Sequence, residues 1–132
     1  MMSKKFAPTL VCALVLAFIA SSPVLAAGDL RLAPDLSFTD DSSSNFPIAG
    51  NSIGDAGIAN DRATIMFFGT AHCWNTNREA ERLVKLYPKY RDKIDFVIVD
   101  VDHPSLSQRP LIARYYRGSI PTITVIDRKG EV

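Results

Sequence analysis

The chain has 132 residues, with 15 Lys and Arg against 14 Asp and Glu, which gives a formal net charge of +1. This length suits one domain rather than two. Because no run of like charge exceeds two residues, the composition offers no electrostatic footprint for nucleic acid or for an anionic membrane surface.

Residues 1–26 have the pattern of a cleaved secretory signal peptide. Met1–Lys5 is a short basic start, Phe6–Ala20 is uncharged and mostly apolar, and Val24–Ala26 offers small residues for cleavage. The alternative is an uncleaved membrane anchor, but the apolar run is shorter than the about 20 residues that a spanning helix needs. We therefore expect an exported protein, periplasmic or secreted, with no membrane contact after cleavage.

Cleavage would leave Cys73 as the only cysteine, because Cys12 lies within the signal. Cys12 sits in the middle of the apolar run, so it does not fit a lipoprotein signal. No internal disulfide can form in the remaining chain. A single cysteine in an exported protein is a reactive thiol, half of an intermolecular disulfide, or a buried inert side chain.

Residues 27–62 are expected to be an irregular lead-in. Alternating apolar residues between Leu30 and Phe38 indicate one short strand. Residues 40–60 are rich in Ser and Gly and are typical of a linker, with one weak helical turn around Ser52–Ala59.

From Ala63 onward the pattern becomes regular. Asn75 or Thr76 is expected to cap the first helix, with Glu79 completing a capping box, and Pro88 marks its end or a late kink. The expected elements are a strand at 63–68, a helix at 75–87, a strand at 94–99, a helix at 107–116, a strand at 122–126 and a turn at 127–130. This order predicts a mixed α/β domain over 63–132, and the last turn predicts a further strand beyond Val132.

Cys73 lies where the first strand meets the first helix. Free N–H groups and the helix dipole stabilise an anion at that position, so they favour a thiolate. The Thr76 hydroxyl, one turn on, is expected to donate to the sulfur. His72 is expected to add positive charge or move a proton, although a solvated loop residue is the alternative. Trp74 is expected to cover the thiol or bind a partner, or else simply to pack.

The segment Phe67–Thr76 resembles the active-site strand and loop of thioredoxins. Val99–Asp102 resembles their next strand end, and Ser119–Thr122 followed by Asp127–Val132 resembles their cis-proline strand and hairpin. The resemblance covers 63–132 and implies a thioredoxin-like fold, a central mixed sheet flanked by helices, truncated before the last strand and helix.

The resemblance also assigns roles to residues. Cys73 matches the nucleophilic cysteine, Pro121 is implied to be cis and beside that sulfur, and Ile120 would offer backbone groups to an extended substrate. The chain departs from the family at three places. Thr76 replaces the second cysteine, His72 replaces a tryptophan, and Phe67 stands where a buried acid is expected.

A site with one thiol forms a mixed disulfide but does not resolve it alone. We therefore expect single-cysteine thiol–disulfide exchange, of the isomerase or mixed-disulfide type, with protein thiols or disulfides as partners and release by an external reducing partner. No cofactor is expected. A non-catalytic binding module with an inert Cys73 is the alternative.

Two further alternatives have weaker signals. Cys73–Asn77 and Leu86–Tyr90 also resemble the cysteine loop and helix of glutathione peroxidases, but Gln108, the only glutamine, stands in a different context. Asp100, Asp102 and His103 are close in sequence without any recognised spacing of metal ligands, so no metal site is expected.

Overall fold

The structure, a computed structural model, describes residues 29–50 and 61–132. The expected signal peptide at 1–26 and the weak turn around Ser52–Ala59 lie outside the described residues. Within these two ranges, no helix is both long enough and apolar enough to cross a membrane.

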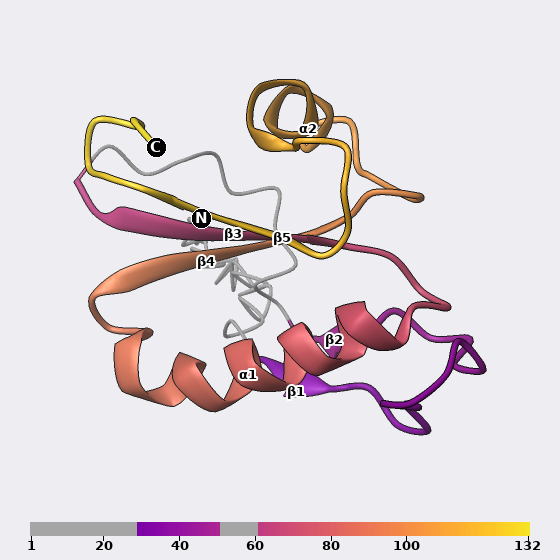
Figure 1. The fold of residues 1–132 in the computed structure, drawn as a ribbon. Coiled ribbons are helices and arrows are strands. Elements are labelled where there is room, and N and C mark those ends of the chain that lie inside the picture. The colour runs from indigo at the N-terminus through magenta and orange to yellow at the C-terminus, as the bar shows by residue number, and fades with distance from the viewer. Residues whose placement is uncertain (1–28, 51–60) are drawn as a thin grey trace, which may run out of the picture.

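The described residues form a mixed α/β fold, as the order of the predicted elements indicated (Figure 1). The elements are β1 (Arg31–Leu32), β2 (Ile48–Ala49), β3 (Ala63–Gly69), α1 (Trp74–Tyr90), β4 (Ile94–Asp100), α2 (Arg109–Tyr115) and β5 (Thr122–Ile126). A three-stranded sheet has the order β4-β3-β5, with β3 parallel to β4 and antiparallel to β5.

The central strand β3 is covered on both faces. α1 lies on one side of the sheet together with β1 and β2, and α2 lies on the other (Figure 1). Successive side chains of a strand point to opposite faces, so Phe67 joins the cluster beneath α1, whereas Met66 and Phe68 join the cluster beneath α2. All three side chains are fully buried, which explains the uninterrupted apolar run in the sequence.

The helix α1 begins earlier and ends later than the sequence predicted. Its N-cap residue is Cys73, whose side chain makes no capping hydrogen bond, so the prediction that Asn75 or Thr76 caps the helix is wrong. Thr76 is instead fully buried inside the first turn. Pro88 lies within the helix, which continues to Tyr90 and closes with a hydrogen bond from the Arg91 N–H to the Tyr87 carbonyl. Tyr87 is buried and Tyr90 packs against the same cluster, so packing extends the last turn past the proline.

The lead-in is a packed part of the fold over the described residues 29–50. The expected short strand near Leu32 is present as β1, which pairs antiparallel with β2, Leu32 opposite Ile48. Leu30 and Ile48 are buried in the cluster beneath α1. The linker interpretation is therefore wrong up to residue 50, because Ile48 obtains its burial from a tertiary contact that the local composition does not reveal.

The turn after β5 has the hairpin chemistry that was expected. The Asp127 N–H donates to the Glu131 carbonyl at 2.9 Å and the Gly130 N–H to the Asp127 carbonyl at 3.1 Å. Gly130 has a φ of 79°, which glycine adopts without a steric cost. The Tyr115 hydroxyl of α2 donates to the Gly130 carbonyl and ties the turn to the helix.

Candidate functional site

Cys73 ends the short connection between β3 and α1. Its thiol is free and half-buried, and it does not belong to either apolar cluster. Its backbone is extended, with φ −139° and ψ 107°, and its carbonyl accepts the Asn77 N–H at 3.1 Å. The sulfur is thus attached at the amino end of a 17-residue helix, where unpaired N–H groups and the helix dipole act on a nearby charge.

His72 precedes the cysteine in an uncommon backbone conformation. Its φ is 56°, in the left-handed region that disfavours residues with a Cβ, and its side chain is exposed. Within the described residues the imidazole has no hydrogen-bond partner. The structure therefore places His72 beside Cys73 in the chain and joins it to no other group of the site.

Thr76 does not hydrogen-bond to the sulfur of Cys73. Its side chain is fully buried, and its Oγ1 has no hydrogen-bond partner within the described part of the chain. Its Cγ2 methyl packs against Gly69, 2.6 Å from the point that a Cβ on that glycine would occupy. The contact that the geometry gives Thr76 is therefore one of packing between α1 and β3.

Trp74 is half-buried at the first position of α1. The Arg78 guanidinium lies over its ring, 5.4 Å from the centroid. Its backbone N–H donates to Asp41 Oδ1 at 3.0 Å. A carboxylate from 33 residues earlier in the chain thus accepts a hydrogen bond from a backbone N–H in the first turn of the helix.

The segment that carries Asp41 is here named the capping loop, residues 35–43. Asn77, fully buried on α1, donates from Nδ2 to the Ser37 carbonyl at 2.6 Å and to Ser43 Oγ at 3.0 Å. Ser43 Oγ also accepts the Ser37 N–H at 2.6 Å. These bonds hold the capping loop against the helix.

Neither Asp41 nor Asn77 is among the site residues predicted from the sequence. Asparagine is a poor helix former, so Asn77 one turn after the helix start is a signal for a buried anchor. The Asp-Ser-Ser run at Asp41 is typical of turn and capping chemistry as much as of a linker.

Ile120 and Pro121 come directly before β5. The peptide bond between them is cis, as the resemblance implied. Ile120 is 36% exposed and Pro121 is half-buried. The Thr122 hydroxyl donates to the Ser119 carbonyl and closes this turn. The position of Pro121 beside the Cys73 sulfur stays a prediction.

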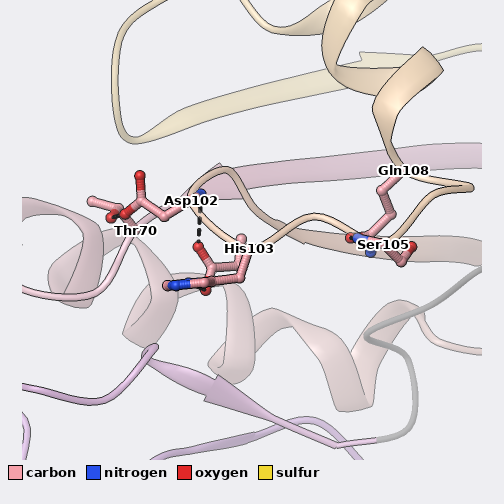
Figure 2. Close-up of polar contacts among 6 residues, drawn as sticks. Thr70, Asp102, His103, Ser105 and Gln108 are labelled. Carbon is pink, nitrogen blue, oxygen red and sulfur yellow. Dashed lines mark hydrogen bonds and ion pairs between the residues drawn. The ribbon is translucent and has the colours of Figure 1, made fainter.

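A group of polar side chains follows the carboxyl ends of β3 and β4 (Figure 2). The Thr70 hydroxyl donates to Asp102, and the Asp102 N–H donates to Asp100 Oδ1 at 3.0 Å. His103 Nδ1 lies 3.3 Å from Asp100 Oδ2. These bonds fix the connection that leads from β3 to Cys73 against the end of β4. In the part of the chain that the structure describes, no three His, Cys, Asp or Glu residues are grouped so that they could hold a metal ion.

Gln108 is buried and has a structural role. Its Nε2 donates to the Ile98 carbonyl at 3.0 Å. Its Oε1 accepts the N–H of Ser105, which lies beside it in Figure 2, at 3.2 Å. The side chain thus braces the connection between β4 and α2, which gives no support to the peroxidase alternative.

The described residues define a mixed α/β fold with a half-buried thiol at a strand-to-helix junction. The chain matches no protein-family model, and no curated protein is significantly similar to it.

Proposed function

We propose that the protein is an exported, thioredoxin-like protein that exchanges thiols and disulfides through Cys73. The proposal depends on one observation: the free thiol of Cys73 is half-buried, and Cys73 is the N-cap residue of α1. A further observation supports it. The order β4-β3-β5 puts β3, which leads to Cys73, at the centre of the sheet.

The chemistry requires a thiolate and a substrate disulfide. The Cys73 thiol loses its proton to solvent, and the thiolate attacks one sulfur of the substrate disulfide. The substrate S–S bond breaks, a mixed disulfide forms, and the other substrate sulfur leaves as a thiolate that takes up a proton. A second substrate thiol, a small thiol or an external reducing partner then attacks the mixed disulfide and restores Cys73.

Cys73 is the only cysteine among the described residues, and Thr76 occupies the position one turn along the helix. When a thiol of the same substrate performs the release, the substrate disulfide is rearranged with no net oxidation. Isomerisation and mixed-disulfide exchange therefore fit the residues better than reduction by the protein alone, and neither needs a cofactor.

Trapping of the mixed disulfide tests this proposal. The chain carrying Cys12→Ser, in which Cys73 is the only thiol, is incubated with a protein that contains scrambled disulfides, quenched in acid and alkylated. We expect a covalent adduct that reducing agent removes, and no adduct with Cys73→Ser. The absence of an adduct under mild oxidation, or an equal yield from Cys73→Ser, would overturn the proposal.

A non-catalytic binding module is the second candidate function, and one observation favours it. The Trp74 N–H, a donor that would otherwise favour a thiolate at this end of α1, is already bonded to Asp41. This candidate requires the alkylation rate of Cys73 to equal that of cysteine in an unstructured peptide. A faster rate, together with the trapped adduct, excludes the binding module.

A further inference from the structure

A carboxylate from outside the helix caps the amino end of α1. Asp41 Oδ1 accepts the N–H of Trp74, the residue that directly follows Cys73. The side chain of Cys73 makes no capping hydrogen bond of its own. A negative charge is therefore held at the same helix end that carries the thiol.

The capping loop is built to present this carboxylate. Asn77 bonds to the Ser37 carbonyl and to Ser43 Oγ on either side of Asp41, and both Asn77 and Ser43 are buried. Inside the loop, Ser37 Oγ accepts the Asp40 N–H at 3.2 Å. Asp41 itself is exposed to solvent.

We infer that Asp41 is a positioning residue for Cys73, whose carboxylate favours the protonated thiol and so limits its reactivity. The inference rests on the proposed function and adds a regulating group to the same site. A carboxylate and a thiolate are like charges, and both are stabilised by the positive end of the helix dipole. Because the carboxylate already occupies that end, formation of the thiolate is less favourable than it would be beside a neutral cap.

Other charged groups belong to the segments that meet at this end of α1. His72 precedes the thiol, Arg78 lies over the Trp74 ring, and Asp35 and Asp40 belong to the capping loop. The Asp40 carboxylate accepts the Ser42 N–H at 3.0 Å within its own loop. Among the described carboxylates, Asp41 is the one that bonds to an N–H in the first turn of α1, so its charge is expected to act most directly.

Asp41→Asn separates the charge from the hydrogen bond, because the amide oxygen still accepts the Trp74 N–H. Asp40→Asn is the matched control, since it removes an adjacent charge that does not bond to the helix. All variants carry Cys12→Ser, and the alkylation of Cys73 by iodoacetamide is followed at about pH 7 and at about pH 10, which lie below and above the ordinary pKa of a cysteine side chain.

We expect Asp41→Asn to raise the rate at about pH 7 by about two- to five-fold, and to leave the rate at about pH 10 unchanged. Asp40→Asn should change the neutral rate less, and Asp41→Glu should keep the wild-type rate. High salt should reduce the difference between wild type and Asp41→Asn, because it screens exposed charges.

An unchanged neutral rate in Asp41→Asn would overturn the inference. An equal rise at both pH values would overturn it too, since that result reports better access to the sulfur rather than easier ionisation. Trapping of mixed disulfides in the same variants keeps the two proposals apart. If Asp41→Asn changes the alkylation rate but no adduct forms, the inference about Asp41 holds and the proposed exchange function is overturned. If an adduct forms but the alkylation rate is unchanged, the exchange function holds and the inference about Asp41 is overturned.

Discussion

The Cγ2 methyl of Thr76 on α1 lies 2.6 Å from the point that a Cβ on Gly69 of β3 would occupy. A real Cβ cannot approach another carbon so closely without displacing it. The last residue of β3 and the first turn of α1 therefore fit together only because residue 69 has no side chain. This close approach helps to fix the start of the helix that carries Cys73.

Gly69→Ala should lower the free energy of unfolding by about 2 kcal/mol, because a buried site without room must be overpacked. The added methyl would meet both Thr76 Cγ2 and the Phe67 ring, whose Cε1 lies 2.8 Å from its position. Urea denaturation measures the loss. Thr76→Ser removes Cγ2, so the double variant should recover part of the stability, and simple additivity of the two single losses would contradict this packing relationship.

Thr76→Val should raise the free energy of unfolding by about 1 kcal/mol, because it replaces a buried hydroxyl that has no hydrogen-bond partner among the described residues by a methyl group of similar size. Thr124→Val is the matched control. Thr124 is also buried, but its Oγ1 donates to the Tyr115 carbonyl at 3.5 Å, so this variant should gain nothing. A fall in the alkylation rate of Cys73 in Thr76→Val would instead support the sequence-based expectation that the hydroxyl stabilises the thiolate.

The parts of the fold that could be predicted are those in which the pattern of apolar residues along the chain indicates the element. β3 and β4 are runs of β-branched and aromatic residues that the sheet buries, and β5 is a similar run that leaves Ile123 and Val125 exposed. α1 follows the helical spacing of its buried residues, Ala80, Leu83 and Tyr87. The position of Cys73 at the strand-to-helix junction follows from these elements alone.

The parts that escaped prediction depend on contacts distant in sequence. The cap of α1 is Asp41, 33 residues before Trp74, and no local pattern specifies that pairing. β1 and β2 have two residues each, too few for a periodic signal, and they are ordered by packing against α1. The hydroxyl of Thr76 was expected to face the sulfur, but spacing along a helix does not determine which side-chain atom faces which neighbour.

Asn77→Ala should lower the free energy of unfolding by about 2 to 3 kcal/mol, because it removes two buried hydrogen bonds and leaves a space between α1 and the capping loop. Asn75→Ala is the matched control, an exposed asparagine on the same helix turn, and should change stability by less than about 0.5 kcal/mol. Amide hydrogen exchange should show faster exchange across residues 35–43 in Asn77→Ala alone. Equal losses in the two variants would show that the anchor is not specific to Asn77.

Stability in acid should depend on Asp127. Its Oδ1 accepts the Glu131 N–H at 3.0 Å and the Lys129 N–H at 2.8 Å, and these backbone hydrogen bonds hold the pKa of the carboxyl below the value of about 3.9 usual for aspartate. A carboxyl whose pKa is lowered by folding adds stability that is fully present above the unfolded value and is lost as the pH falls through the folded pKa. Asp127→Asn should therefore make the free energy of unfolding less dependent on pH below about pH 4.

Two measurements check the role of Asp127. Titration of its side-chain carboxyl by NMR should give a midpoint below about 3.9. Urea denaturation of wild type and Asp127→Asn at a series of acidic pH values should give the steeper pH dependence in wild type. Parallel pH profiles, or a midpoint at or above the usual aspartate value, would mean that the carboxylate contributes nothing to the turn. In that case the φ of Gly130 and the hydrogen bond from the Tyr115 hydroxyl would have to hold the turn by themselves.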